Sequence, residues 1–190
     1  MKTAYTCFCT DIIHDGHLNI INEARKKGRV IVGALSDKTL IRYNKFPTIS
    51  QEERVKLYRS IEGVEEVVIQ EDMMYDDVIT LIHPDYVIHG DNWKEGPEKA
   101  IRDHVESLVN AYGGQMVDVP YTYNEKVKKI DLQLREKLAM PEYRRKRLRQ
   151  LLDMTPVVKA MEAHSGLTGL IVEKTVVEHE CKLDQFDAMW

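Results

Sequence analysis

The chain has 190 residues, of which 43% are hydrophobic and 31% are charged, as expected for one soluble globular domain with an extension. Its net charge of −4 excludes a basic field over the whole chain of the kind that holds nucleic acid. No apolar stretch is long enough to cross a membrane, the N-terminus does not resemble a signal peptide, and three cysteines form no disulfide or zinc pattern, so we expect a cytoplasmic protein.

Strands and helices alternate through the first 140 residues. A continuous apolar run at Arg29–Leu35 is typical of a strand buried on both faces, and Ser50 with Glu53 fits a capping box that begins a helix. The expected strands span 2–9, 29–35, 66–69, 86–88 and 115–119, and the expected helices span 16–27, 51–61, 75–82, 97–112 and 124–138. This order predicts an α/β fold with a Rossmann-like, doubly wound, five-stranded parallel sheet.

The composition changes after residue 140. A basic run predicts a helix over 142–152, and a second helical pattern covers 167–174. We therefore expect two parts, a domain over 1–140 and a C-terminal helical extension over 141–190. The basic run favours a solvated helix face, with an interaction surface as the alternative.

The segment between the first strand and the first helix carries the strongest functional signal. A helix N-terminus offers unpaired N–H groups to phosphate, and Gly16 would let the backbone approach such a ligand. His14 and His17 lie three apart, so both could donate to triphosphate oxygens. Asp11, at the strand tip, is a candidate ligand for a divalent cation.

Two other groups are candidates with open alternatives. Arg42 and Lys45 follow the second strand, in an expected loop, and could neutralise an anionic substrate or merely keep the loop soluble. Cys7 and Cys9 would share one strand face, which favours buried core thiols over a redox site.

The run Asp11-Ile12-Ile13-His14-Asp15-Gly16-His17 fits Asp-x-x-His-x-Gly-His and resembles the cytidylyltransferase superfamily, which includes glycerol-3-phosphate cytidylyltransferase. The resemblance covers residues 1 to about 130 and implies the nucleotidyltransferase fold of that superfamily. Arg54 resembles its characteristic helix arginine, which implies a phosphate contact. The segment His89-Gly90-Asp91-Asn92-Trp93 resembles its Gly-Asp-Asp-Trp segment, which implies that His89, Gly90, Asp91 and Trp93 lie near the nucleotide.

The sequence also departs from the superfamily pattern. The family's Gly-Thr-Phe-Asp is Phe8-Cys9-Thr10-Asp11 here. Its late Arg-Thr-Glu-Gly-Ile-Ser-Thr-Thr segment is replaced by residues 121–128, where the arginine is missing. Thr122, Lys126 and Lys128 are the candidate phosphate ligands there, with a solvated helix face as the alternative for the lysines.

The C-terminal part carries a second resemblance. Residues 161–168 and 186–190 look like the opening of phosphoenolpyruvate mutase, a (β/α)₈ barrel family. Such a barrel needs the loops of several strands for its active site, so this part would be a truncated mutase domain. The order of the two parts resembles bifunctional enzymes of phosphonate biosynthesis.

Together these resemblances imply transfer of CMP from CTP to a small phosphonate, 2-aminoethylphosphonate or 2-hydroxyethylphosphonate, with Mg²⁺ as cofactor. Alternatives are a glycerol-3-phosphate-type cytidylyltransferase, an adenylyltransferase, and a non-catalytic nucleotide-binding module that regulates a mutase. We expect no nucleic acid and no membrane as partner. Dimerisation is common in the superfamily, so a homodimer is a further expectation.

Overall fold

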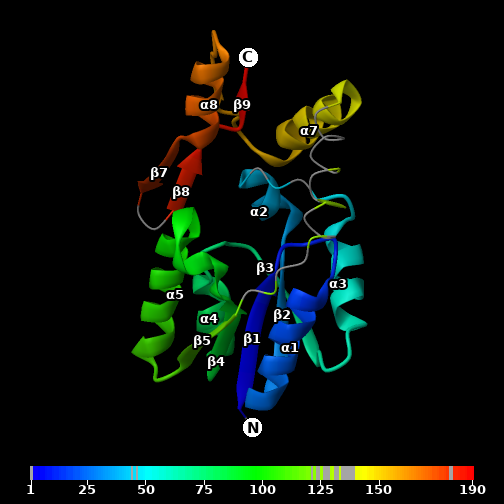
Figure 1. The fold of residues 1–190 in the computed structure, drawn as a ribbon, viewed down its shortest axis with the longest axis vertical. Coiled ribbons are helices and arrows are strands. Elements are labelled where there is room, and N and C mark those ends of the chain that lie inside the picture. The colour runs from blue at the N-terminus through cyan, green and yellow to red at the C-terminus, as the bar shows by residue number, and fades with distance from the viewer. Residues whose placement is uncertain are drawn as a thin grey trace.

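Figure 1 shows a computed structural model of the chain, which describes residues 2–43, 45, 47–120, 122, 125, 129–130, 133, 140–179 and 182–190. The sheet has the strand order β3-β2-β1-β4-β5, and every neighbouring pair is parallel. The strands are β1 (Thr3–Phe8), β2 (Arg29–Leu35), β3 (Glu66–Gln70), β4 (Tyr86–Gly90) and β5 (Gln115–Val119). The predicted doubly wound parallel sheet is thereby confirmed.

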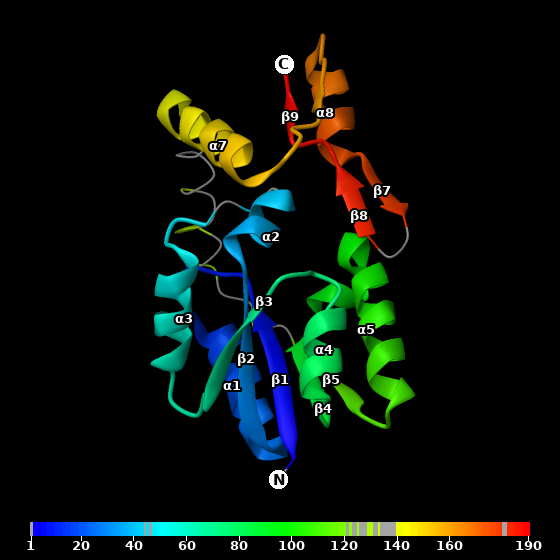
Figure 2. The same ribbon diagram turned by 180° about the vertical axis from the view of Figure 1, so that it is seen from behind.

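Helices cover both faces of this sheet (Figures 1 and 2). On one face, α1 (Asp15–Lys27) and α3 (Gln51–Arg59) pack with Ala4 and Phe8 of β1. On the other face, α4 (Asp76–Ile82) and α5 (Lys99–Ala111) pack with Tyr5 and Cys7. The two cores follow from the alternation of strand side chains. The pairing of β1 with β4 covers Ala4–Tyr5 and Tyr86–Val87 and stops before the carboxyl ends of the two strands.

Two parts of this domain differ from the prediction, and a third lies mostly outside the described residues. A short helix, α2 (Asp37–Arg42), lies where a loop was expected; Ser36 caps it by accepting the N–H of Thr39. Its six residues are too few to show a helical period in the sequence. Two 3₁₀ turns, η1 (Asp91–Lys94) and η2 (Gly96–Glu98), precede α5, which therefore begins two residues later than predicted. The helix expected over 124–138 falls mostly outside the described residues.

The C-terminal part is mixed rather than helical, which corrects the prediction. Its helices are α7 (Pro141–Met154) and α8 (Gly166–Lys174), close to the predicted spans. Its strands are β6 (Ala160–Met161), β7 (Val176–His179), β8 (Lys182–Gln185) and β9 (Ala188–Met189), which form two separate pairs, β6-β9 and β7-β8. Strands of two to four residues leave too short a pattern to be recognised in a sequence.

The C-terminal part lies beyond the carboxyl ends of the sheet strands (Figures 1 and 2), and α7 packs against α2. None of the helices in the described part of the chain combines the length and the apolar composition needed to span a membrane.

Candidate active site

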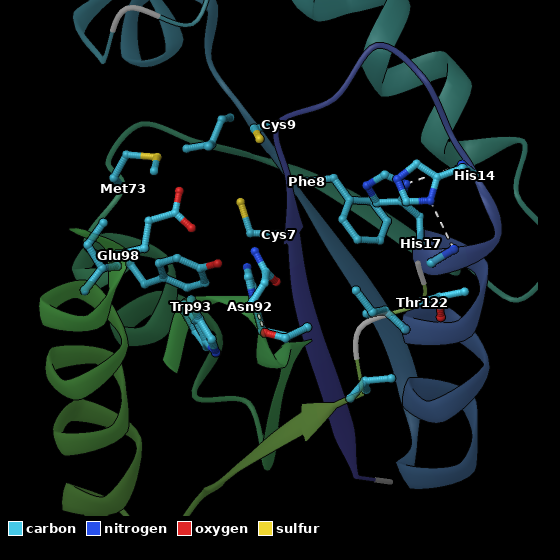
Figure 3. Close-up of a pocket in the computed structure, with 18 of the residues that line it drawn as sticks. Cys7, Phe8, Cys9, His14, His17, Met73, Asn92, Trp93, Glu98 and Thr122 are labelled. Carbon is cyan, nitrogen blue, oxygen red and sulfur yellow. Dashed lines mark hydrogen bonds between the residues drawn. The ribbon is translucent and has the colours of Figure 1, made fainter. Parts of the chain in front are cut away.

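A pocket of about 280 Å³ opens at the carboxyl edge of the sheet. Its lining residues come from the ends of β1, β2, β4 and β5, from the start of α1, from the segments that hold Lys45, Met73 and Tyr75, and from the turns before α5 and its first turn. Figure 3 shows His14, His17 and Thr122 on the α1 side of β1 and Met73, Trp93 and Glu98 on the α5 side. Ligands of open α/β sheets bind at this topological position.

The two histidines cap helix α1 reciprocally. His14 is the N-cap residue, and its Nδ1 accepts the N–H of Gly16 at 3.1 Å. Three residues on, the Nδ1 of His17 accepts the N–H of His14 at 3.3 Å. This arrangement is a capping box made of imidazoles, and it satisfies two backbone donors that a helix start leaves unpaired.

The capping box determines which ring nitrogens remain for a ligand. A neutral imidazole has one donor and one acceptor nitrogen, and each Nδ1 is already used as an acceptor. The proton of the neutral ring therefore sits on Nε2 in both histidines. Burial, with smaller contributions from His14 and His89, lowers the pKa of His17 to about 4, so this ring is neutral at pH 7. His17 thus offers a neutral N–H donor to the pocket.

Packing fixes the two rings. The ring centroids of His14 and His17 lie 4.0 Å apart, and Phe8 meets His17 edge-on with centroids 4.9 Å apart. A Cβ at Gly16 would lie 2.8 Å from Cε1 of His14, so the absence of a side chain there makes room for the ring. The glycine was expected to admit a ligand, and the structure adds that it admits the capping histidine.

The opposite wall is an aromatic pair held by a carboxylate. His89 and Trp93 are stacked, with ring centroids 3.8 Å apart and planes 20° apart. The indole N–H of Trp93 donates to Asp118 at 3.1 Å, and Arg102 and Lys94 pair with the same carboxylate at 2.9 and 3.1 Å. Burial opposes ionisation of Asp118, but these three donors outweigh it and lower its pKa. Burial also lowers the pKa of His89.

Lys45 and Glu98 form an ion pair at the pocket wall, with Nζ and Oε1 3.5 Å apart. The Lys45 ammonium also lies 3.9 Å from the Cys9 sulfur. Burial disfavours the charge on Lys45, yet Cys9 and Glu98 favour it more and raise its pKa. Among the lining residues that the structure describes, these two are the only lysine, arginine, aspartate or glutamate side chains.

The resemblance implied a phosphate contact for Arg54, but Arg54 is not among the residues that line the pocket. Its side chain is fully buried, and its guanidinium donates to the Leu35 carbonyl at 2.6 Å and pairs with Asp37 at 2.8 Å. Asp11 does not line the pocket either: it accepts the Thr48 N–H, and its other oxygen lies 3.9 Å from Arg54. This cluster around the buried Arg54 side chain joins the end of β2 to the segment before α3.

The remaining predicted residues divide between the pocket and its surroundings. Gly16, His89, Gly90, Trp93, Lys45 and Thr122 line the pocket. Arg42 is exposed at the end of α2, and Asp91 begins η1; neither is among the lining residues. Lys126 and Lys128 lie outside the described residues.

Sequence reasoning missed several lining residues. Asn92 and Glu98 follow β4, and their place after a strand end was the available signal. Cys7 is buried, as expected, but the predicted burial of Cys9 is wrong: it lies just beyond β1 and is exposed. Both cysteines line the pocket.

The described residues contain no group of three histidine, cysteine, aspartate or glutamate side chains that could hold a metal ion. The Asp11 carboxylate, the predicted magnesium ligand, is engaged by Thr48 and faces Arg54. These residues do not form a protein cage for magnesium. Magnesium is commonly bound through substrate phosphates with few protein ligands, so an ion carried by a nucleotide would need no such cage.

Comparisons with known proteins identify the family of the chain. The bifunctional protein HldE of Desulfatibacillum aliphaticivorans is 32% identical over 122 residues, which cover 63% of this chain and 24% of that protein. The FAD synthase of Methanohalobium evestigatum is 27% identical over 101 residues, covering 53% of this chain and 67% of the synthase. The chain thus matches only about a quarter of the length of its HldE relative.

Among solved structures, the lipopolysaccharide core biosynthesis protein of Thermoplasma volcanium superposes with a TM-score of 0.52 at 20% identity, covering 65% of this chain and 99% of that one. This likeness shows a shared fold. The family model described as cytidylyltransferase-like matches residues 5–149, a span that holds every wall of the pocket. The chain therefore belongs to the cytidylyltransferase-like family of nucleotidyltransferases.

Proposed function

We propose that the chain transfers CMP from CTP to a small phosphonate and releases pyrophosphate. The observation that carries this proposal is the imidazole capping box, which leaves the Nε2–H groups of His14 and His17 for phosphate oxygens at a helix N-terminus. The choice of a phosphonate rests on the resemblance of the C-terminal part to a phosphonate-forming mutase.

In the proposed reaction, an oxygen of the phosphonate attacks the α-phosphorus of CTP in line. The new bond joins that oxygen to the α-phosphorus, and the bond to the bridging oxygen of the β-phosphate breaks, so pyrophosphate leaves with the electron pair. The attacking oxygen is already ionised, so no protein base is required. Such transfers depend on positioning and charge stabilisation.

His14 and His17 would stabilise the charge that develops on the phosphates, because fixed N–H donors need no reorganisation. His89, Gly90 and Trp93 would form the wall against the nucleotide, and Lys45 and Thr122 would meet anionic oxygens. Magnesium would bind with CTP and neutralise part of the charge of its phosphates. Asp11 would not serve as a magnesium ligand. Asp91 and Arg54 would act on the nucleotide only through the segments they belong to.

The test is pyrophosphate release from CTP with 2-aminoethylphosphonate, 2-hydroxyethylphosphonate and glycerol 3-phosphate, by the wild type and His17→Ala. By analogy with the loss of one oxyanion-hole donor, the variant should lose about 10²–10³-fold in kcat. Wild-type turnover in His17→Ala would overturn the assignment. Binding of CTP without pyrophosphate release with any acceptor would favour the non-catalytic module.

An adenylyltransferase is the second candidate, because one of the relatives is named FAD synthase. The same measurement with ATP in place of CTP separates the two. Higher kcat/KM with ATP would reassign the nucleotide and leave the roles of the histidines intact.

A further inference from the structure

The ion pair of Lys45 and Glu98 is a feature that transfer from CTP does not itself require. Both side chains line the pocket, on the wall opposite the histidines, and each is about two-fifths exposed. An ion pair this exposed contributes little to stability. It can therefore be exchanged for contacts with a bound molecule at small cost.

The charges of this wall restrict what can replace the pair. An acceptor with only an anionic group would take Lys45 and leave the Glu98 carboxylate beside a new negative charge. An acceptor with an anionic group and an ammonium would pair with both side chains at once. Among the described lining residues, no other lysine, arginine, aspartate or glutamate is available to compensate.

Apolar side chains beside the ion pair raise the cost of an unmatched charge. The side chains of Met73, Tyr75 and Ile101 line the same wall, and Tyr75 and Ile101 are almost fully buried. Interactions between charges are stronger beside such apolar groups than in open water, so a mismatched charge costs more there. Lys45 keeps its ammonium near Cys9 and Glu98, so both signs of charge are present at neutral pH.

We infer that Lys45 and Glu98 form the acceptor subsite and that it selects a zwitterion, a small phosphonate that carries an ammonium group. Lys45 receives the phosphonate oxygens and Glu98 the ammonium. This inference rests on the proposed function and decides between the two acceptors in favour of the amino compound.

The test compares kcat/KM for 2-aminoethylphosphonate and 2-hydroxyethylphosphonate, which differ only in the terminal group, with saturating CTP. The wild type should prefer the amino compound about tenfold or more, the size of a hydrogen bond to a charged group. Glu98→Gln keeps the shape of the side chain and removes its charge, so the ratio should fall by a similar factor. Glu95→Gln, at an exposed residue in the same segment but outside the pocket, is the matched control and should keep the ratio.

The outcomes distinguish a failure of this inference from a failure of the proposed function. A wild type that prefers the hydroxy compound, or a ratio unchanged in Glu98→Gln, would overturn the inference and leave the proposed function standing. No pyrophosphate release with either phosphonate would overturn the proposed function, and the inference with it. Thermal unfolding followed by circular dichroism verifies that each variant is folded, and Glu98→Ala, which also removes the charge, replaces Glu98→Gln if that variant does not fold.

Discussion

Apolar side chains are mostly buried in the sheet domain and mostly exposed in the C-terminal part. In the sheet domain, two clusters of apolar residues are almost completely buried on the two faces of β1. In the C-terminal part, Leu167 and Ile171 of α8 are 69% and 57% exposed and Trp190 is 77% exposed, while Leu151 and Val172 are the large apolar residues buried there. An apolar surface of this kind is unusual on a free domain.

Both the stability of the chain and its pocket depend on the sheet domain. Every wall of the pocket is built on elements that the two cores hold in place. The C-terminal part is made of two two-stranded pairs and two largely exposed helices, which do not bury enough surface to be stable alone. Changes at the buried supports of the site should therefore cost far more than changes on α8.

The largest effect is expected at Arg54. Replacing it with methionine would leave the Asp37 and Asp11 carboxylates without their buried cation, and breaking such a pair costs about 3 kcal/mol in the free energy of unfolding. Urea denaturation measures this loss. Arg54→Lys should recover only part of the lost stability, because lysine keeps the positive charge but lacks the planar guanidinium with its several N–H donors. A loss below about 1 kcal/mol would show that the cluster does not support the fold.

Asp118 should have the next largest effect. Asp118→Ala removes the acceptor of the Trp93 indole and the carboxylate that pairs with Lys94 and Arg102, which should destabilise the domain by about 2 kcal/mol. It should also raise KM for CTP more than it lowers kcat, because Trp93 is proposed to form a wall against the nucleotide and to donate to no phosphate. Fluorescence of Trp93 in a Trp190→Phe background reports the change. Asp118→Asn, which keeps an acceptor, should restore the fluorescence in part.

The pH dependence of stability tests the burial of His17. Its pKa is about 4 in the folded chain, below the value of about 6.5 in an unfolded chain. Between these two pKa values the unfolded state binds more protons than the folded state. The contribution of His17 to the free energy of unfolding is therefore fully present above pH 6.5 and is lost as the pH falls toward 4. The slope is at most about 1.4 kcal/mol per pH unit. Urea midpoints at pH 7 and 5 measure it, and His17→Gln should flatten the dependence; an equally steep slope in that variant would contradict the burial.

The smallest effect is expected on α8. Leu170 is 50% exposed, so Leu170→Ser should change the free energy of unfolding by less than about 0.5 kcal/mol. The matched control is Ile21→Ala in α1, at a residue 1% exposed, where a loss of at least about 2 kcal/mol is expected. Equal losses at the two sites would show that the C-terminal part belongs to the same cooperative core.

The sequence predicted the parallel sheet because its central strands are continuous apolar runs, such as Arg29–Leu35, bounded by helix caps. It also predicted that His14 and His17 lie together, since a strand end followed by a helix start fixes their position. It could not place Arg54, because helical spacing does not say whether a cation faces a ligand or two partly buried carboxylates. Glu98 was missed because its contact with Lys45 joins segments 53 residues apart.

The central claim is that each histidine keeps its Nδ1 for the helix cap and presents a protonated Nε2 to the nucleotide. Nitrogen NMR of ¹⁵N-histidine-labelled protein at pH 7, with and without CTP, tests it most directly. We expect an unprotonated Nδ1 and a protonated Nε2 in His17, with the Nε2 resonances of His14 and His17 shifting on addition of CTP. A protonated Nδ1 in neutral His17, or Nε2 resonances that do not shift on addition of CTP, would contradict this claim.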